Sequence, residues 1–284
     1  MAGAQDLVPG AYTPAPVGAN IVTLLANFND GDINFDPSLP ITEGRATIGV
    51  TALGLTRTLR IAGRSANIGV AVPYVLGHLQ GLLSGTFQEA SRSGLGDSSV
   101  RFAINLYGAP AMAPQQFGAF RWSTILGFSL TVGTPLGQYF PERFINIGAN
   151  RWSFRPEIGF ARKRGPWTFE ADAAVAFFTD NGNYQNGGTR EQAPIFSGQG
   201  HVVRTFRPGL WIAGDGNFWR GGRITVNDAA AIELQRNSRL GLTLAVPIGR
   251  QQLRVAYSFG AYTRLGGDFN SLGVSYSYAW FGHP

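Results

Sequence analysis

Apolar and polar residues alternate along much of this chain with a period of two. Successive side chains of a β-strand point to opposite faces, so this period predicts strands. Segment 150–160, NRWSFRPEIGF, shows the pattern clearly. One face would carry Trp152, Phe154, Pro156, Ile158 and Phe160, and the other Arg151, Ser153, Arg155, Glu157 and Gly159.

The same alternation recurs from residue 20 to residue 280, and it is weaker at 20–28, 195–206 and 209–219. Most of these segments have the ~9–11 residues with which a tilted strand crosses a bilayer. The pattern therefore predicts about twelve antiparallel strands in an all-β fold. They cover residues 20–28, 46–54, 66–76, 98–107, 120–132, 150–160, 167–177, 195–206, 209–219, 240–246, 253–261 and 272–280.

The connections between these segments alternate in length, which is the rhythm of an up-and-down barrel with tight turns at one rim. Chain ends are expected at the short-turn rim, and residues 1–284 form a single domain with a flexible N-terminal segment at 1–18. Short connections fall at 59–65, 161–166, 207–209 and 247–251, an intermediate one at 108–116, and long ones at 29–45, 77–97, 133–149, 179–194 and 220–231.

Two features fit the strand pattern poorly. Proline cannot donate to a strand ladder, so Pro73 and Pro156 predict bulges or local bends. Arg236 and Ser238 occupy the apolar phase, which predicts that their strand extends past the membrane or shifts phase.

Composition decides which face of the strands meets water. Charged residues make up 14 % of the chain, against about 25 % in soluble domains. The polar faces carry mostly Gly, Ala, Ser and Thr, and about twelve aromatic-rich faces would overfill a compact core. We therefore expect the apolar faces to meet lipid and the polar faces to line an enclosed lumen, in a barrel closed on itself. Four tryptophans near strand ends fit interfacial aromatic girdles: Trp122, Trp152, Trp167 and Trp280.

Charge and cysteine content exclude other classes. The net charge is +6, but the arginines are scattered and the one basic run, 162–164, lies beside an apparent turn, so nucleic acid is not an expected partner. Without cysteine there is no disulfide framework. No apolar stretch reaches the ~18–20 residues of a spanning helix. Residues 2–4, Ala-Gly-Ala, fit a mature chain after removal of a signal peptide, and equally a cytosolic start.

Several motifs resemble a known family. These are SGLGDSS at 93–99, GTPLGQY at 133–139, NIGANRWSFRPEIGF at 146–160 and the whole of 237–280. Together they are similar to the family described as the "MetA pathway of phenol degradation". The resemblance implies a transporter barrel in the bacterial outer membrane. The last strand departs from the usual ending, because Phe281 is followed by Gly-His-Pro.

Charged residues in the inward phase are the candidate site. They would form a selectivity lining of the solute path, or salt bridges that rigidify the wall. We favour salt bridges between Arg155 or Glu157 and the next strand's Glu170 or Asp172. The full set is Arg101, Arg121, Arg151, Arg155, Glu157, Glu170, Asp172, Asp215, Glu233, Arg239 and Arg254.

Two further groups have open roles. Asp97 follows Gly94-Leu95-Gly96 and is expected to form a turn. Five loop aromatics would meet an apolar solute or pack the loops together: Tyr139, Phe140, Phe144, Tyr184 and Trp219.

Catalysis is poorly supported by the sequence. The histidines are His78, His201 and His283, and a strand places Ser197 roughly 13 Å from His201 by rise, beyond hydrogen-bond reach. We expect no catalytic residues, no metal and no cofactor. The predicted function is passive uptake of small molecules, aromatic or otherwise hydrophobic. A lipid-modifying enzyme and a closed structural or adhesive barrel are the alternatives. The expected partners are outer-membrane lipids, a small-molecule solute and the barrel-assembly machinery.

Overall fold

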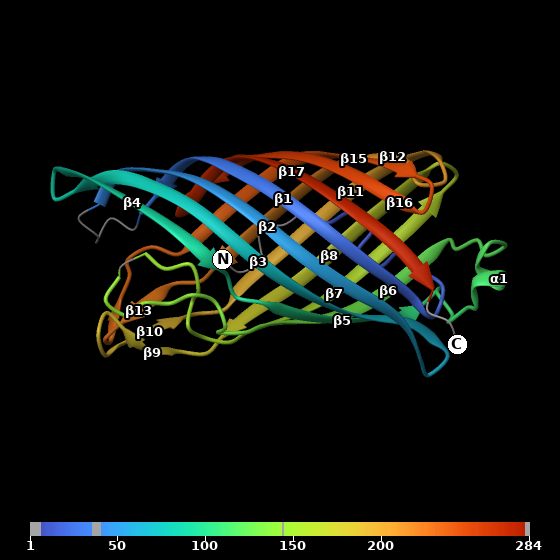
Figure 1. The fold of residues 1–284 in the computed structure, drawn as a ribbon, viewed down its shortest axis with the longest axis horizontal. Helices are drawn as coiled ribbons and strands as arrows, with labels where there is room; N and C mark the ends of the chain where they lie inside the picture. Colours follow the sequence, from blue (N-terminus) through green and yellow to red (C-terminus); the bar gives the residue numbers. More distant parts are fainter. Residues whose placement is uncertain (1–6, 36–40, 144, 282–284) are drawn as a thin grey trace.

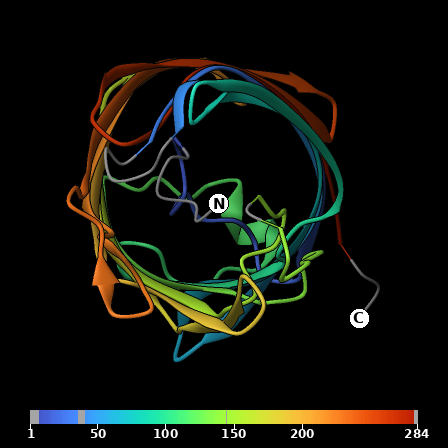
Figure 2. The same ribbon diagram turned by 90° about the vertical axis from the view of Figure 1, so that its left-hand side faces the viewer.

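A computed structural model describes residues 7–35, 41–143 and 145–281. Its strands form a closed antiparallel barrel of twelve wall strands, as the alternation predicted (Figures 1 and 2). β1 pairs with β17 along its whole length, and β2 pairs with β3. The wall comprises β1 (Ala19–Asn34), β2 (Ile41–Ile61), β3 (Arg64–Leu83), β4 (Thr86–Leu95), β5 (Ser99–Tyr107), β6 (Thr124–Gly133), β7 (Ser153–Arg164), β8 (Trp167–Phe178), β11 (Ile195–Arg207), β12 (Leu210–Gly221), β15 (Gln235–Ile248), β16 (Gln251–Thr263) and β17 (Gly266–Phe281).

β4 and β5 are two parts of one wall strand, both paired with β3. The strand breaks opposite Pro73, whose carbonyl accepts a hydrogen bond from the Gly96 N–H at 2.9 Å. The pairing register also shifts by one residue across the break, since Tyr74 pairs with Leu95 and Ala71 with Ser99. The predicted irregularity at Pro73 is confirmed, and its cause is the missing N–H.

Pro156 produces no bulge, so the bulge predicted at this residue is wrong. Pro156 pairs with Leu130 on β6 in regular register. The ladder to β8 omits residues 155 and 156 and then resumes in the same register. One edge of β7 therefore loses a short piece of ladder without a shift in register.

The tight turns at 62–63, 165–166, 208–209 and 249–250 lie at one rim, on the right in Figure 1, together with the start of β1 and the end of β17. The exception at this rim is the connection 108–123, which is longer than predicted and contains α1 (Pro114–Phe117). We assign this rim to the periplasm because short turns mark the periplasmic side. Two short connections, at 84–85 and 264–265, lie at the opposite rim. No helix among the described residues is long and apolar enough to cross a membrane.

The opposite, extracellular rim differs from the prediction in two places. Residues 29–34 and 41–45 extend β1 and β2, and 77–95 is largely a strand hairpin of β3 and β4. Long loops were predicted there, but these segments continue the ladders past the apolar belt. Arg236 likewise lies on β15 with its side chain exposed, so the strand extends outward. A small second sheet covers this rim: β9 (Asn181–Tyr184), β10 (Gly188–Gln192), β13 (Ile224–Val226) and β14 (Ala229–Ala230).

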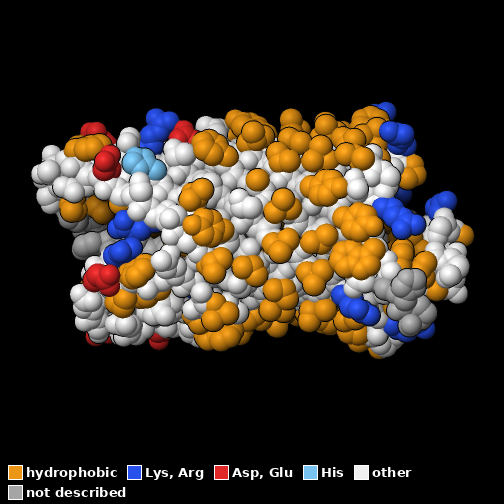
Figure 3. Space-filling model, viewed as in Figure 1, with side chains coloured by type: hydrophobic (Ala, Val, Ile, Leu, Met, Phe, Trp, Pro, Cys, Tyr) orange, Lys and Arg blue, Asp and Glu red, His pale blue; other side chains and the backbone are white. Residues whose placement is uncertain are grey.

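The outer wall is apolar, as predicted. Leu53 is 57 % exposed, Leu242 59 % and Ile158 56 %, and side chains of this kind cover the middle of the barrel in Figure 3. Trp152 and Trp167 are exposed near the ends of the belt. Trp122 departs from this girdle, because it precedes β6 and packs against buried residues that include Tyr12. Large apolar faces exposed on a closed barrel are the signature of a protein solvated by lipid.

Candidate functional site

The chain's own N-terminal segment lies inside the barrel. Figure 2 views the barrel from its extracellular end and shows this segment within the ring of strands. The Gly10 N–H donates to Glu170 Oε2 at 2.7 Å, and the Gly18 N–H donates to the Thr58 carbonyl at 3.0 Å. We call residues 7–18 the plug. The predicted flexible segment 1–18 is thus bonded to the wall over 7–18, while residues 1–6 lie outside the described residues.

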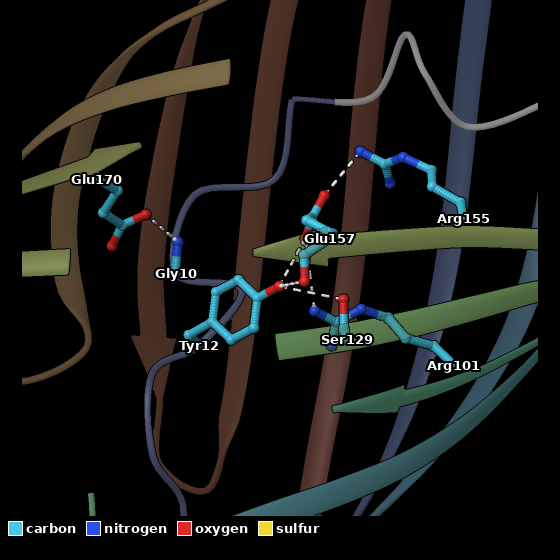
Figure 4. Close-up of polar contacts among 7 residues, drawn as sticks. All are labelled: Gly10, Tyr12, Arg101, Ser129, Arg155, Glu157 and Glu170. Atoms are coloured by element: carbon cyan, nitrogen blue, oxygen red, sulfur yellow. Dashed lines mark hydrogen bonds and ion pairs between the residues drawn. The ribbon is translucent and has the colours of Figure 1, made fainter. Parts of the chain in front are cut away.

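Tyr12 is the central contact of the plug (Figure 4). Its hydroxyl lies 3.1 Å from Ser129 Oγ and 3.0 Å from Glu157 Oε1, and its side chain is buried. The ring lies over Gly127 and Gly159, which pair directly across β6 and β7. A Cβ at either glycine would overlap the ring. The two glycines therefore make the flat patch on which the plug rests.

Glu157 joins the plug to the cations of the wall. Arg155 Nη2 bonds its Oε2 at 2.7 Å, and Arg101 Nη2 lies 3.9 Å from Oε1. The Arg101 guanidinium is also 5.4 Å from the centre of the Tyr12 ring. A buried carboxylate is stable here because two guanidinium groups and a hydroxyl face it.

The predicted cross-strand pairing of Arg155 or Glu157 with the acids of β8 is wrong. The register places Glu157 opposite Ala174, Glu170 opposite Ala161, and Asp172 opposite Gly159. Arg155 turns instead to Glu157 on its own strand, and Glu170 bonds the plug. Asp172 is buried beside a small depression in the lumen wall that Arg155, Gln199 and Asn217 also line.

A second buried network connects β11, β12 and β15. His201 Nδ1 lies 2.7 Å from Asp215 Oδ1, and the Thr243 hydroxyl donates to Asp215 Oδ2 at 2.6 Å. The His201 and Asp215 side chains are 0 % and 1 % exposed. His201 Nε2 has no hydrogen-bond partner, so no serine forms a nucleophile–base pair with it. This network holds three wall strands together.

Arg239 and Arg254 occupy separate positions on the inner wall. Arg239 Nη2 donates to Ser271 Oγ at 2.6 Å and to the Phe269 carbonyl at 3.0 Å, and so joins β15 to β17. Arg254 Nε donates to Gln252 Oε1 at 3.0 Å, with its guanidinium 5.2 Å from the Trp211 ring.

Three predicted site residues lie off the inner wall of the barrel. Arg121 is exposed in the periplasmic connection and donates to the carbonyls of residues 118 and 120. Arg151 lies in the extracellular connection before β7, where it bonds Gln192. Burial lowers the pKa of Arg151 to about 10, so its guanidinium stays charged at neutral pH. Glu233 forms an ion pair with Arg264 at the extracellular rim.

Among the described residues, no group of three or more His, Asp or Glu side chains could hold a metal ion.

Asp97 fixes the extracellular connection 134–152. Its Oδ1 accepts from the Gly137 N–H at 2.9 Å and its Oδ2 from the Ala149 N–H at 2.7 Å. The predicted turn residue therefore acts at the β4–β5 break as a clamp on two distant backbone sites.

Asp97→Ala should loosen this connection, because two backbone donors lose a charged acceptor. We expect protease cleavage within 134–152 to become at least about tenfold faster, while the barrel stays folded. Limited proteolysis with mass spectrometry measures the rate. Asp97→Asn keeps one acceptor oxygen and should give a smaller increase, and equal cleavage of all three proteins would contradict this role.

The loop aromatics mostly pack. Trp219 is 1 % exposed and contacts Ala176 and Ile195. The Tyr139 hydroxyl donates to the Asn183 carbonyl, and Phe140 lies 3.9 Å from the Arg143 guanidinium. Tyr184 lies beneath Arg190, and Phe144 lies outside the described residues.

Sequence reasoning missed the plug and the His201 network. Residues 7–18 have no periodicity, so nothing in them predicted a place inside the barrel. The paired inward glycines at 127 and 159 were the available signal, since glycine within a strand marks a close approach by another group.

Comparisons with known proteins support this architecture. The COG4313 outer membrane channel of Pseudomonas putida F1 matches with a TM-score of 0.84 and 18 % identity, over 97 % of this chain and 100 % of that one. The β domain of the Bordetella autotransporter BrkA matches with a TM-score of 0.53 and 12 % identity, over 91 % and 98 %. These likenesses show the barrel fold. No curated protein matches the sequence.

The sequence also fits a family model over residues 21–278, nearly the whole chain. This is the family that the motifs at 93–99, 133–139, 146–160 and 237–280 indicated, so that prediction is confirmed. The chain is thus an outer-membrane β-barrel that belongs to the family described as "Putative MetA-pathway of phenol degradation".

Proposed function

We propose that this protein is a passive channel for small aromatic or otherwise hydrophobic molecules, closed at rest by residues 7–18. The observation that carries the proposal is the plug itself. A solid structural barrel would fill its lumen with wall side chains. Here the contents are a chain segment held by a few hydrogen bonds, chiefly those of Gly10 and Tyr12. Such a segment can leave without unfolding the wall.

The solute class rests on the family description, which refers to phenol degradation. The charged residues of the inner wall, Arg101, Arg155, Glu157, Glu170, Asp172, Asp215, Arg239 and Arg254, would border the path once the plug moves. Equal numbers of cations and anions among them give a wall with no net charge, which suits an uncharged solute. Outer-membrane lipids surround the barrel, and barrel-assembly machinery inserts it.

Swelling of vesicles that contain the protein tests the proposal. Vesicles with folded barrel should swell faster in small uncharged solutes than vesicles without it, and the difference should shrink as the solute grows. Identical swelling with and without barrel would favour the closed structural barrel. Release of fatty acid from the vesicle lipids would favour the enzyme.

Arg155→Glu should change ion selectivity, because Arg155 is a lumen cation beside Glu157. We expect the permeability ratio of cations to anions to rise by about tenfold, since charges in a narrow low-dielectric passage act strongly on passing ions. The reversal potential in a salt gradient measures this ratio. Arg45→Glu, on the exposed outer face, is the matched control and should leave it unchanged. An unchanged ratio in Arg155→Glu would remove this residue from the path.

A further inference from the structure

The periplasmic rim of the barrel is basic and lacks acidic residues. In the described part of the chain, no Asp or Glu occurs in the turns at this rim or in the strand ends beside them. On the face shown in Figure 3, red carboxylates lie only at the extracellular end, whereas blue side chains lie at both ends. The basic residues of this rim are Arg57, Arg60, Arg64, Arg121, Arg162, Lys163, Arg164, Arg204, Arg207 and Arg250.

Three of these arginines form one cluster on the lipid-facing surface. Trp167 on β8 pairs with Arg164 on β7 and with Arg204 on β11. Trp167 therefore lies between these two arginines, in one row across three strands. Neighbouring strands are ~4.8 Å apart, which places the two arginine Cα atoms roughly 10 Å from each other. Arg162 lies in the next row on the same face and contacts Thr124. All three arginines are exposed.

The cluster is placed at the boundary of the apolar belt. The Arg204 guanidinium lies 5.2 Å from the Trp167 ring, which orients it along the surface. One row closer to the middle of the barrel, Phe169 and Val202 are 46 % and 45 % exposed. Tryptophan at this depth marks the interface, where lipid phosphates lie.

Carboxylates accompany some of the exposed arginines at the extracellular rim. Arg45 pairs with Asp30 at 2.7 Å, Arg143 lies 3.8 Å from Glu142, and Arg264 pairs with Glu233. Arg220 and Arg236 differ from these three, because they pair with each other across β12 and β15. No carboxylate among the described residues lies at the rim of Arg162, Arg164 and Arg204, so an anion that approaches them from the membrane meets no acidic side chain of the described chain there.

We propose that Arg162, Arg164, Trp167 and Arg204 form a binding site for the phosphate of an anionic phospholipid in the periplasmic leaflet. Guanidinium groups match phosphate oxygens with paired hydrogen bonds. Trp167 packs beside the glycerol region, and Phe169 and Val202 contact the acyl chains. The site faces lipid rather than water, which favours a phospholipid over a free phosphate ion. The inference rests on the membrane location of the barrel and not on conduction, so it can fail or hold independently of the proposed function.

The test compares lipid binding to the whole protein in zwitterionic detergent by native mass spectrometry. The probes are phosphatidylglycerol, phosphatidylcholine and inorganic phosphate. We expect wild type to retain phosphatidylglycerol in preference to the other two. Arg162→Gln/Arg164→Gln/Arg204→Gln should bind phosphatidylglycerol about a hundredfold more weakly, since each arginine near a lipid surface contributes severalfold. The control Arg45→Gln/Arg143→Gln/Arg264→Gln loses the same charge and should bind as wild type does.

Several results would overturn the site. These are equal retention of phosphatidylcholine and phosphatidylglycerol, equal loss in both triple variants, or competition by inorganic phosphate at equal concentration. If Arg162→Gln/Arg164→Gln/Arg204→Gln does not fold, tryptophan fluorescence of the native protein still tests the site. Brominated phosphatidylglycerol should quench it more than brominated phosphatidylcholine, and Trp167→Phe should abolish that difference. A difference that persists in Trp167→Phe would contradict the site.

Discussion

Gly127→Ala should open the channel although it changes no residue of the plug. A Cβ at residue 127 would overlap the Tyr12 ring, and its nearest neighbours are all atoms of that ring. Overpacking of this kind destabilises the state with the plug seated by about 1–3 kcal/mol, and it does not affect the state with the plug removed. The ratio of open to closed channels should therefore rise by about one to two orders of magnitude. Single-channel recording in planar bilayers measures the open fraction directly.

The control for this prediction is Gly54→Ala, another inward glycine on the wall. A Cβ there would lie 3.8 Å from its nearest atoms, which is ordinary contact, so the open fraction should stay that of wild type. Gly159→Ala should act like Gly127→Ala, because its Cβ also overlaps Tyr12. If Gly127→Ala and Gly54→Ala gave the same open fraction, the plug would not control conduction.

Asp215→Ala should give the largest loss of stability. It leaves His201 Nδ1 and the Thr243 hydroxyl without a partner where neither can reach water. Each unsatisfied buried group costs about 1–3 kcal/mol, so the free energy of unfolding should fall by about 2–5 kcal/mol. Reversible urea unfolding in lipid vesicles measures the loss.

Asp215→Asn keeps an acceptor oxygen, so its free energy of unfolding should fall by about half as much as that of Asp215→Ala. Asp180→Ala removes an exposed carboxylate at the extracellular rim and should change the free energy of unfolding by less than about 0.5 kcal/mol. Equal stability of Asp215→Ala and Asp180→Ala would show that the buried network contributes nothing.

The wall of the barrel could be predicted because one physical rule sets it. A strand between lipid and an enclosed lumen must alternate apolar side chains, which face lipid, with small or polar ones, which face the lumen. All twelve predicted segments overlap wall strands of the structure. The wrong loop predictions lie at the extracellular rim, where no lipid faces the strands and the alternation is not required. Residues 29–34 are mostly polar and residues 77–83 lack a clean alternation, so the sequence predicts loops there, but their ladders continue beyond the membrane.

The contents of the lumen could not be predicted in the same way. Contacts such as Tyr12 with Glu157 join residues 145 positions apart, and no local pattern encodes them. The pairing of Arg155 with Glu157 rather than with β8 depends on a register that alternation leaves open. Inward phase identified Glu157, Glu170 and Asp215 as lumen residues, but not the partners that each one binds.

The unitary current of the wild-type protein, recorded in a planar bilayer before and after addition of phenol, tests passive conduction of an aromatic solute most directly. We predict a small, intermittent conductance that phenol interrupts in brief events, with a frequency proportional to its concentration. A folded, inserted barrel whose current stays at the level of the bare bilayer, in wild type and in Gly127→Ala alike, would contradict the account.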